Sequence, residues 1–223
     1  MSQFGKIAVI GGTGKLGSAL AKRWLRAGLE VSIGSRDAGR AQQAAEALAA
    51  DLGVPVDHGA NADVAARADV VVLTVPFASQ EGIVNDIRPA IGAQLVIDTT
   101  APLVPPKVMR VQLPEPGCAA LRTKRILGDA ANVCSAFQTV AAHKLDSDAD
   151  LRSDVLVFGD VKEQRERVAD LVEAAGLRPV HAGSLQNSAA AEALTSVLIF
   201  INRYYSADGA GIEITGIGRG PDD

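Results

Sequence analysis

A glycine-rich turn near the start of the chain constrains the fold more than any other feature of the sequence. Gly12, Gly14 and Gly17 have the G-x-G-x-x-G spacing of dinucleotide-binding turns. The apolar run 7–10 before the turn is typical of a buried strand, and the amphipathic stretch 15–27 after it predicts a helix. Strand, glycine turn and helix therefore follow one another in the order that a nucleotide site requires.

Each glycine of this turn has a physical reason to be there. Gly12 allows a sharp turn, Gly14 lets the backbone approach a pyrophosphate, and Gly17 lets the helix pack close to the strand. The N–H groups and the dipole at the start of the helix then attract the anion. The spacing alone also occurs in ordinary tight connections, so the flanking strand and helix carry the prediction. The cofactor contacts expected here come from Gly12, Thr13, Gly14, Lys15 and Leu16.

The turn after the second expected strand, 29–33, indicates which nucleotide is bound. Many NAD-binding folds place an acidic residue at this point, on the ribose hydroxyls. Here Ser35 and Arg36 occupy the turn, and a guanidinium offers a planar fork of donors to a 2'-phosphate. Arg40 adds a second positive charge one helical turn later. The sequence favours NADP over NAD, with two alternatives left open: Asp37 as an NAD-type acid, and arginines that are only solvated.

The rest of the chain alternates strand-like and helix-like segments, which predicts an α/β fold of the Rossmann type with a doubly wound, mostly parallel sheet. We expect an NADP-binding Rossmann domain over residues 1–145 and a smaller C-terminal α/β unit over 146–223 that closes an acceptor cleft. One compact domain is the alternative. The expected strands are 7–10, 29–33, 54–56, 70–74, 95–98, 133–137, 154–158 and 178–181, the expected helices are 15–27, 41–52, 63–67, 79–91, 119–127, 161–175 and 187–202, and 146–150 is expected as a solvated loop.

Two segments of this pattern bear on the site and on assembly. Thr74 ends the fourth expected strand, and Val75 and Pro76 follow it at the carboxyl end, where open parallel sheets bind ligands. These residues line the nucleotide's path or form an ordinary strand-to-helix connection. The last helix is apolar on more than one face, so we expect it to be buried on several sides, by the chain itself or by a second copy.

Composition and charge exclude several classes of protein. The 223 residues are 48% hydrophobic and 22% charged, as in an ordinary globular protein. A net charge of -4 without a long basic run argues against a nucleic-acid surface. No apolar stretch reaches the roughly 18 residues of a membrane-spanning helix. Cys118 and Cys134 lack metal-site spacing, and no signal peptide is expected, so we predict a cytoplasmic protein with free thiols and no metal.

Four segments together make the chain similar to the F420-dependent NADP reductases, and the resemblance runs from residue 7 to about residue 214. The segments are 11–17, 34–36, 73–76 and the stretch 176–185. The resemblance implies a homodimeric oxidoreductase that transfers hydride between NADP(H) and the deazaflavin coenzyme F420. Such a reaction needs close stacking of two rings and exclusion of water, so no catalytic acid or base is expected.

The resemblance also implies roles for individual residues. Thr13, Ser35, Arg36 and Arg40 match the family's contacts to the NADP phosphates, with Arg40 in the place of a lysine. These four positions therefore carry the implied nucleotide contacts.

On the deazaflavin side, Thr195 matches a threonine near the coenzyme, and Val140 matches an isoleucine that spaces the two rings. Gln138 stands where some members have histidine, and Ala193 where some have serine. These two departures leave room for an NADPH-dependent flavin or other small-molecule reductase on the same scaffold, or for a non-catalytic NADP(H)-binding module.

Overall fold

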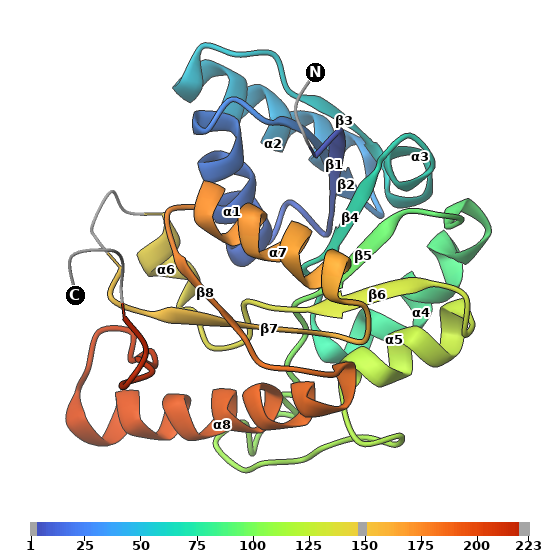
Figure 1. Ribbon diagram of the computed structural model, residues 1–223. Coiled ribbons are helices and arrows are strands. Elements are labelled where there is room, and N and C mark those ends of the chain that lie inside the picture. The colour runs from blue at the N-terminus through green and yellow to red at the C-terminus, as the bar shows by residue number, and fades with distance from the viewer. Residues whose placement is uncertain (1–3, 147–150, 219–223) are drawn as a thin grey trace.

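An eight-stranded sheet crosses the whole molecule in the computed structural model, which describes residues 4–146 and 151–218 (Figure 1). The strands follow one another across the sheet in the order β3-β2-β1-β4-β5-β6-β7-β8, and only β6 and β7 pair antiparallel. The expected α/β fold with a mostly parallel sheet is confirmed. The strands are β1 (Lys6–Ile10), β2 (Glu30–Ser35), β3 (Asp57–Ala60), β4 (Val70–Leu73), β5 (Leu95–Asp98), β6 (Asn132–Ser135), β7 (Asp154–Gly159) and β8 (Arg178–His181).

Helices cover both faces of the sheet, and alternate side chains of the buried strands form two separate cores. In β1, Ile7 and Val9 face one core, whereas Ala8 and Ile10 face the other. The first core is covered by α1 (Lys15–Arg26), α2 (Ala38–Leu52), α6 (Ala142–Leu145) and α7 (Lys162–Ala174), and the second by α3 (Asn61–Ala66), α4 (Phe77–Ile87) and α5 (Ala119–Leu127). Short 3-10 turns occupy Arg88–Ala90 and Leu185–Asn187.

Three long-range hydrogen bonds and one ring contact hold α1 against later parts of the chain. The Trp24 indole, fully buried, donates a hydrogen bond to the carbonyl of Leu171 in α7 at 2.8 Å. Arg23 donates from Nε to the carbonyl of Leu145 and from Nη1 to that of Ala175, both at 2.7 Å. The Trp24 ring also meets the Phe137 ring edge-on, with centroids 6.1 Å apart. Side chains far apart in sequence thus fix the helix whose N-terminus opens at the glycine turn.

Phe137 departs from the strand that the sequence predicts. The run 133–137 is expected to be extended, but β6 ends at Ser135 and Phe137 has a φ of 71°. A bulky side chain rarely adopts this left-handed conformation, so the fold holds the backbone there against a conformational cost. The turn carries the chain from β6 directly into Gln138.

The expected third strand over 54–56 is wrong, because β3 spans Asp57–Ala60. Its residues are exposed or half-buried at the edge of the sheet, so hydrophobicity does not mark them. The apolar residues before them, with Pro55 among them, form the connection from α2 instead. The expected loop 146–150 falls, except for Asp146, outside the described residues.

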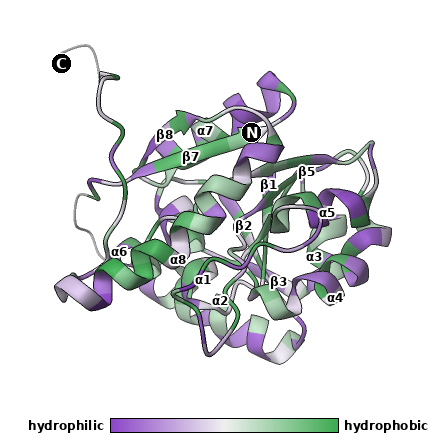
Figure 2. Cartoon of the chain, turned by 90° about the horizontal axis from the view of Figure 1, so that it is seen from below, coloured by the Kyte–Doolittle hydropathy of each residue, from purple (hydrophilic) through white to green (hydrophobic). Residues whose placement is uncertain are grey.

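The last helix, α8 (Ser188–Tyr205), lies beneath β7 at the lower end of the molecule in Figure 1. This chain buries only part of α8, so packing within the chain does not account for the expected burial, and burial by a second copy stays a prediction. Phe200 is 50% exposed and Tyr204 is 70% exposed, and Val197 is exposed too. Figure 2 views the molecule from the side of α8 and shows a long hydrophobic stretch on this helix. One face of α8 is therefore apolar and open.

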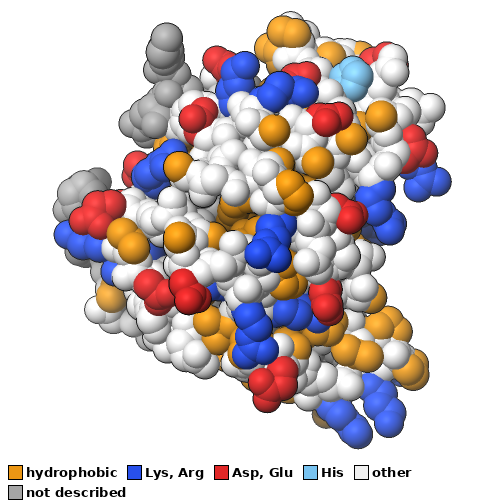
Figure 3. All heavy atoms as spheres, turned by 90° about the vertical axis from the view of Figure 1, so that its right-hand side faces the viewer, with side chains coloured by type: hydrophobic (Ala, Val, Ile, Leu, Met, Phe, Trp, Pro, Cys, Tyr) orange, Lys and Arg blue, Asp and Glu red, His pale blue; other side chains and the backbone are white. Residues whose placement is uncertain are grey.

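The remaining surface is mixed in charge. On the face shown in Figure 3, acidic and basic side chains are interspersed among polar and apolar ones. Among residues 4–146 and 151–218, no helix is long and apolar enough to cross a membrane.

Candidate functional site

A hollow of about 380 Å³ opens at the carboxyl ends of β1, β2 and β4, the position at which doubly wound sheets bind nucleotides. It gathers most of the residues predicted to bind the cofactor. Its lining consists of Gly11, Thr13, Gly14, Ser35, Arg36, Asp37, Arg40, Asn61, Thr74, Val75, Pro76, Ser79 and Ile83. Three predicted residues do not line it: Gly12 is buried below the turn, Lys15 is exposed, and Leu16 packs against the first core.

The glycines of the turn are required by close backbone packing. A Cβ on Gly17 would lie 2.4 Å from Thr74 Oγ1 and 2.9 Å from the Cα of Gly12, distances that no side chain can tolerate. A Cβ on Gly12 would lie 2.9 Å from the carbonyl oxygen of Val9. The turn therefore presses the start of α1 onto the ends of β1 and β4, as a helix that receives a pyrophosphate requires.

The N-terminus of α1 is open to an anion. Its N-cap is Gly14, which provides no side-chain cap, and the first turn of the helix holds no acidic residue. The first N–H groups of a helix have no partner within the helix, and the helix dipole adds partial positive charge there. This helix start is thus suited to a phosphate group.

The turn after β2 carries one acidic side chain, Asp37, and two basic ones, Arg36 and Arg40, which make different contacts. The Asp37 carboxylate accepts hydrogen bonds from the N–H groups of Gly39 and Arg40, at 2.9 and 3.2 Å, and so caps α2. Ser35 Oγ accepts from the N–H of Asp37 at 3.2 Å. Arg36 is exposed, and Arg40 approaches Asp37 only to 3.9 Å. Asp37 caps its own helix through Oδ1, and it borders the hollow together with the two guanidinium groups.

Sequence reasoning missed Asn61, Ser79 and Ile83 in this lining. Asn61 is buried, and its Oδ1 lies 3.5 Å from the backbone nitrogen of Gly11, at the limit of a hydrogen bond. Asn61 directly follows β3, so a correct placement of that edge strand would have put it at the carboxyl end beside Ser35. Ser79 and Ile83 lie three and seven residues after Pro76 on one face of α4, so helical spacing could have identified them.

The residues predicted for the acceptor side meet only in part. Thr195 of α8 donates from Oγ1 to the carbonyl of Gln138 at 2.9 Å. The Gln138 amide donates to the carbonyl of Asp98 at 3.0 Å and to Ser135 Oγ at 2.6 Å. Val140 is half-buried and lines a different hollow of about 220 Å³, beside Lys144 and the chain after α8. Gln138 and Thr195 therefore form a unit from which Val140 stands apart.

Glu192 of α8 is a buried acid that the sequence prediction did not single out. Its carboxylate oxygens accept from the N–H groups of Ala119 and Ala120, at 2.6 and 3.0 Å, so a side chain of α8 caps α5. Burial raises the pKa of Glu192 to about 8, against the opposing effect of the two N–H donors.

This raised pKa predicts a pH-dependent stability. The folded state holds the Glu192 proton more tightly than the unfolded state, whose pKa is near 4.5. The group's contribution is thus present below that value and is lost as the pH rises toward about 8. Glu192→Gln should flatten the fall in the free energy of unfolding across this window by at most about 1.4 kcal/mol per pH unit. Urea unfolding at several pH values measures this slope, with the exposed Glu46→Gln as control. An unchanged slope in Glu192→Gln would contradict the expectation.

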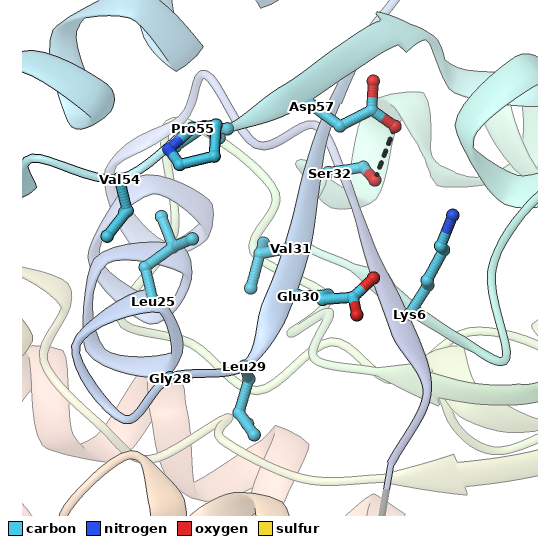
Figure 4. Close-up of a pocket in the computed structure, with 11 residues that line it drawn as sticks. Lys6, Leu25, Gly28, Leu29, Glu30, Val31, Ser32, Val54, Pro55 and Asp57 are labelled. Carbon is cyan, nitrogen blue, oxygen red and sulfur yellow. Dashed lines mark hydrogen bonds between the residues drawn. The ribbon is translucent and has the colours of Figure 1, made fainter. Parts of the chain in front are cut away.

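A larger hollow, of about 560 Å³, lies at the opposite, amino-terminal ends of β1, β2 and β3 (Figure 4). Its wall is apolar on the side of Leu25 and Val54, and its polar side carries Lys6, Ser32 and Asp57, with Ser32 bonded to Asp57. It has no glycine turn and no helix N-terminus. The size of a hollow therefore does not identify the nucleotide site here, whereas its position on the sheet does.

The doubly wound sheet, the glycine turn and the open start of α1 define a dinucleotide-binding protein of the Rossmann class. A family model described as NADP oxidoreductase coenzyme F420-dependent matches residues 6–102. An F420-dependent NADP reductase from Methanothermobacter thermautotrophicus is 38% identical over 95% of this chain and 95% of that protein. Its namesake from Methanothermobacter marburgensis is 36% identical over 95% and 99%. The chain belongs to the family of F420-dependent NADP reductases.

A solved structure supports the fold at this level. A chain from Arthrobacter sp. FB24, assigned to the F420-dependent NADP reductases, superposes with a TM-score of 0.79 at 23% identity, covering 95% of this chain and 99% of that one. The match extends the common architecture through β7, β8 and α8.

Proposed function

We propose that this protein transfers hydride between NADP(H) and coenzyme F420, with NADP(H) in the hollow at the carboxyl ends of β1, β2 and β4. The single observation that carries the nucleotide half is the arrangement of charge around that hollow. Arg36, Arg40 and Asp37 all border it, and Asp37 caps α2 through Oδ1, so two positive charges and one carboxylate lie around the hollow. The names of the relatives, over nearly the whole chain, support the acceptor half.

The chain's own groups bind and orient the two partners. The open start of α1 holds the pyrophosphate, and Arg36 and Arg40 hold the 2'-phosphate through charge-assisted hydrogen bonds. Val75 and Pro76 line the same hollow and would contact the nicotinamide part of the bound nucleotide. The nicotinamide supplies the hydride when NADPH is bound, and the protein contributes proximity and exclusion of water. This mechanism requires no acid or base from the chain.

The acceptor side has a polar atom to offer to a heterocyclic ring. Within the described part of the chain, one buried oxygen at the carboxyl end of β6, Gln138 Oε1, has no hydrogen-bond partner. Buried polar atoms are usually paired, so an unpaired one points to a missing partner. A deazaflavin ring, which carries both N–H and carbonyl groups, matches this need. We propose that residues 151–218, which include α8, close the cleft around this ring.

The direct test is the loss of F420 absorbance in the presence of NADPH. The proposal expects turnover with F420 and much weaker turnover with FMN or FAD. Preferred turnover with a flavin would identify an NADPH:flavin reductase instead. Tight NADPH binding without turnover of any of the three acceptors would identify a non-catalytic NADP(H)-binding protein.

The resemblance implies that Val140 spaces the two rings, whereas the structure places it in a different hollow, and shortening its side chain decides between the two. Val140→Ala should lower the single-turnover rate of hydride transfer about 3- to 30-fold, since the rate depends steeply on the placement of the reacting atoms. The dissociation constant of NADPH should stay within about twofold, because Val140 does not line the nucleotide hollow. Stopped-flow absorbance gives the rate, and Val161→Ala on the exposed end of α7 is the control. An unchanged rate would remove Val140 from the site.

We further propose that the protein is a homodimer in the cytoplasm. The open apolar face of α8, with Val197, Phe200 and Tyr204, supports the dimer, because a second copy would bury it. The two free, buried cysteines support a reducing compartment. Sedimentation equilibrium should give about twice the chain mass of 23.0 kDa, and a mass equal to the chain would contradict the dimer.

A further inference from the structure

Gln80 is the centre of a buried polar network. It is neither one of the residues that line the nucleotide hollow nor one of those predicted for the acceptor side. It lies on α4 with no exposed surface. Its Nε2 donates to Asp98 Oδ2 at 2.5 Å, to the carbonyl of Ala119 at 3.2 Å and to Thr123 Oγ1 at 3.1 Å. One side chain of α4 thus holds both β5 and α5.

Asp98 ends β5 and is also fully buried, and burial raises the pKa of its carboxyl. Besides Gln80, Thr123 Oγ1 donates to Asp98 Oδ2 at 2.6 Å, and the N–H of Thr100 donates to Asp98 Oδ1 at 2.8 Å. The last contact fixes the turn after β5. Because all these groups are buried, removal of Gln80 would leave Asp98 Oδ2 with one donor in place of two and weaken the network.

The backbone carbonyl of Asp98 connects this network to the acceptor side. It accepts from Gln138 Nε2 at 3.0 Å and from the N–H of Ala136 at 3.2 Å. The Gln138 carbonyl in turn accepts from Thr195 Oγ1 at 2.9 Å. The strained turn at Phe137 lies between these contacts, so the orientation of the Gln138 amide depends on where the Asp98 carbonyl stands.

The other end of Gln80 faces the start of α4. Arg122 donates to Gln80 Oε1 from Nε at 2.8 Å and from Nη2 at 2.5 Å, and to the carbonyl of Phe77 at 3.1 Å. Its guanidinium lies 4.1 Å from the centre of the Phe77 ring. Phe77 follows Pro76, which lines the nucleotide hollow. The network thus spans the interior from the nucleotide wall to the acceptor unit.

We propose that Gln80 is a positioning residue of the hydride-transfer site, which through Asp98 fixes the Gln138 amide on the acceptor side. The proposal rests on the function proposed above. It assigns Gln80 no contact with either ligand. Its loss should therefore weaken acceptor binding and hydride transfer much more than NADPH binding.

The experiment compares Gln80→Leu with the wild type in three measurements. The single-turnover rate of hydride transfer to F420 should fall about 10- to 100-fold, as expected when a positioning group moves the reacting atoms by about 1 Å. The dissociation constant of NADPH should stay within about threefold. Amide hydrogen exchange without ligand should speed up in a peptide covering 132–140, which contains the Ala136 N–H, and should stay unchanged over 12–18.

Two further variants separate positioning from stability. Val172→Ala shortens a buried side chain of α7 in the first core, remote from Gln80. It should lower stability without changing the ratio of hydride transfer to NADPH binding.

Gln80→Glu places a carboxyl group between Asp98 and Arg122. The new side chain can form a hydrogen bond with Asp98 only when the two carboxyl groups share a proton. The variant's hydride-transfer rate should approach that of the wild type at low pH and fall as the pH rises, a dependence that Gln80→Leu lacks.

The outcomes keep the two proposals distinct. No F420 turnover by the wild type would overturn the proposed function, while the hydrogen-exchange comparison would still decide whether Gln80 orders 132–140. Faster hydrogen exchange along the whole chain of the Gln80→Leu variant, or equal losses of NADPH binding and hydride transfer, would mean that Gln80 contributes only to stability. Unchanged exchange over 132–140 would overturn the inference.

Discussion

Arg36→Ala should raise the KM for NADPH about 10- to 100-fold, because a charge-assisted hydrogen bond to a phosphate contributes about 1.5–3 kcal/mol. NADH has no 2'-phosphate, so its KM should change less than about twofold. The ratio of the two kcat/KM values, measured by steady-state F420 reduction, gives the result. Asp37 caps α2 through Oδ1, and its Oδ2 lies 3.9 Å from Arg40 Nε, so the variant keeps a positive charge beside this carboxylate.

Arg125→Ala is the matched control, since it removes an exposed arginine from α5, away from the nucleotide hollow. It should change neither KM by more than about twofold. Arg40→Ala should have a smaller effect of the same sign as Arg36→Ala. Equal changes for NADPH and NADH in Arg36→Ala would mean that this residue does not contact the 2'-phosphate.

Gly17→Ala should impair both nucleotide binding and stability. The added Cβ would stand 2.4 Å from Thr74 Oγ1 and 2.9 Å from the Cα of Gly12, so α1 must move away from the ends of β1 and β4. Overpacking of this kind costs about 1–3 kcal/mol of unfolding free energy. The displaced helix start should weaken NADPH binding by more than about 10-fold. Urea unfolding and titration of NADPH fluorescence measure the two effects.

Gly82→Ala makes the same chemical change where there is room for it. No atom lies within 4 Å of the Cβ it would add on α4, so alanine should stabilise the helix by up to about 1 kcal/mol. NADPH binding should be unchanged. If Gly17→Ala behaved like Gly82→Ala, the close packing at the turn would not be needed for the site.

The N-terminal half of the fold follows closely from local sequence signals. The strand 95–98 and the helix 119–127 are bounded as predicted, because an apolar run and a Gly128 stop signal mark them clearly. The edge strand β3 escapes prediction, since half-exposed residues such as Asp57 carry no hydrophobic pattern. Asn61 was missed for the same reason.

The candidate site divides in the same way. Ser35 and Arg36 can be assigned from sequence because they come at the carboxyl end of β2, the strand that follows the glycine turn and its helix. Gln80 and Glu192 cannot, since their importance arises from burial and from partners far away in the chain. The sequence left open what buries α8, because an apolar helix does not reveal whether its partner is the same chain or a second copy.

The attachment of α1 to α6 and α7 has a consequence for how the chain melts. The Trp24 and Arg23 bonds, together with the antiparallel pairing of β6 with β7, join the N-terminal strands to the C-terminal segment through backbone groups. Neither part can lose its structure without exposing buried donors of the other. Calorimetry should therefore show one cooperative transition with equal calorimetric and van't Hoff enthalpies per cooperative unit, and two resolved peaks would mean two domains.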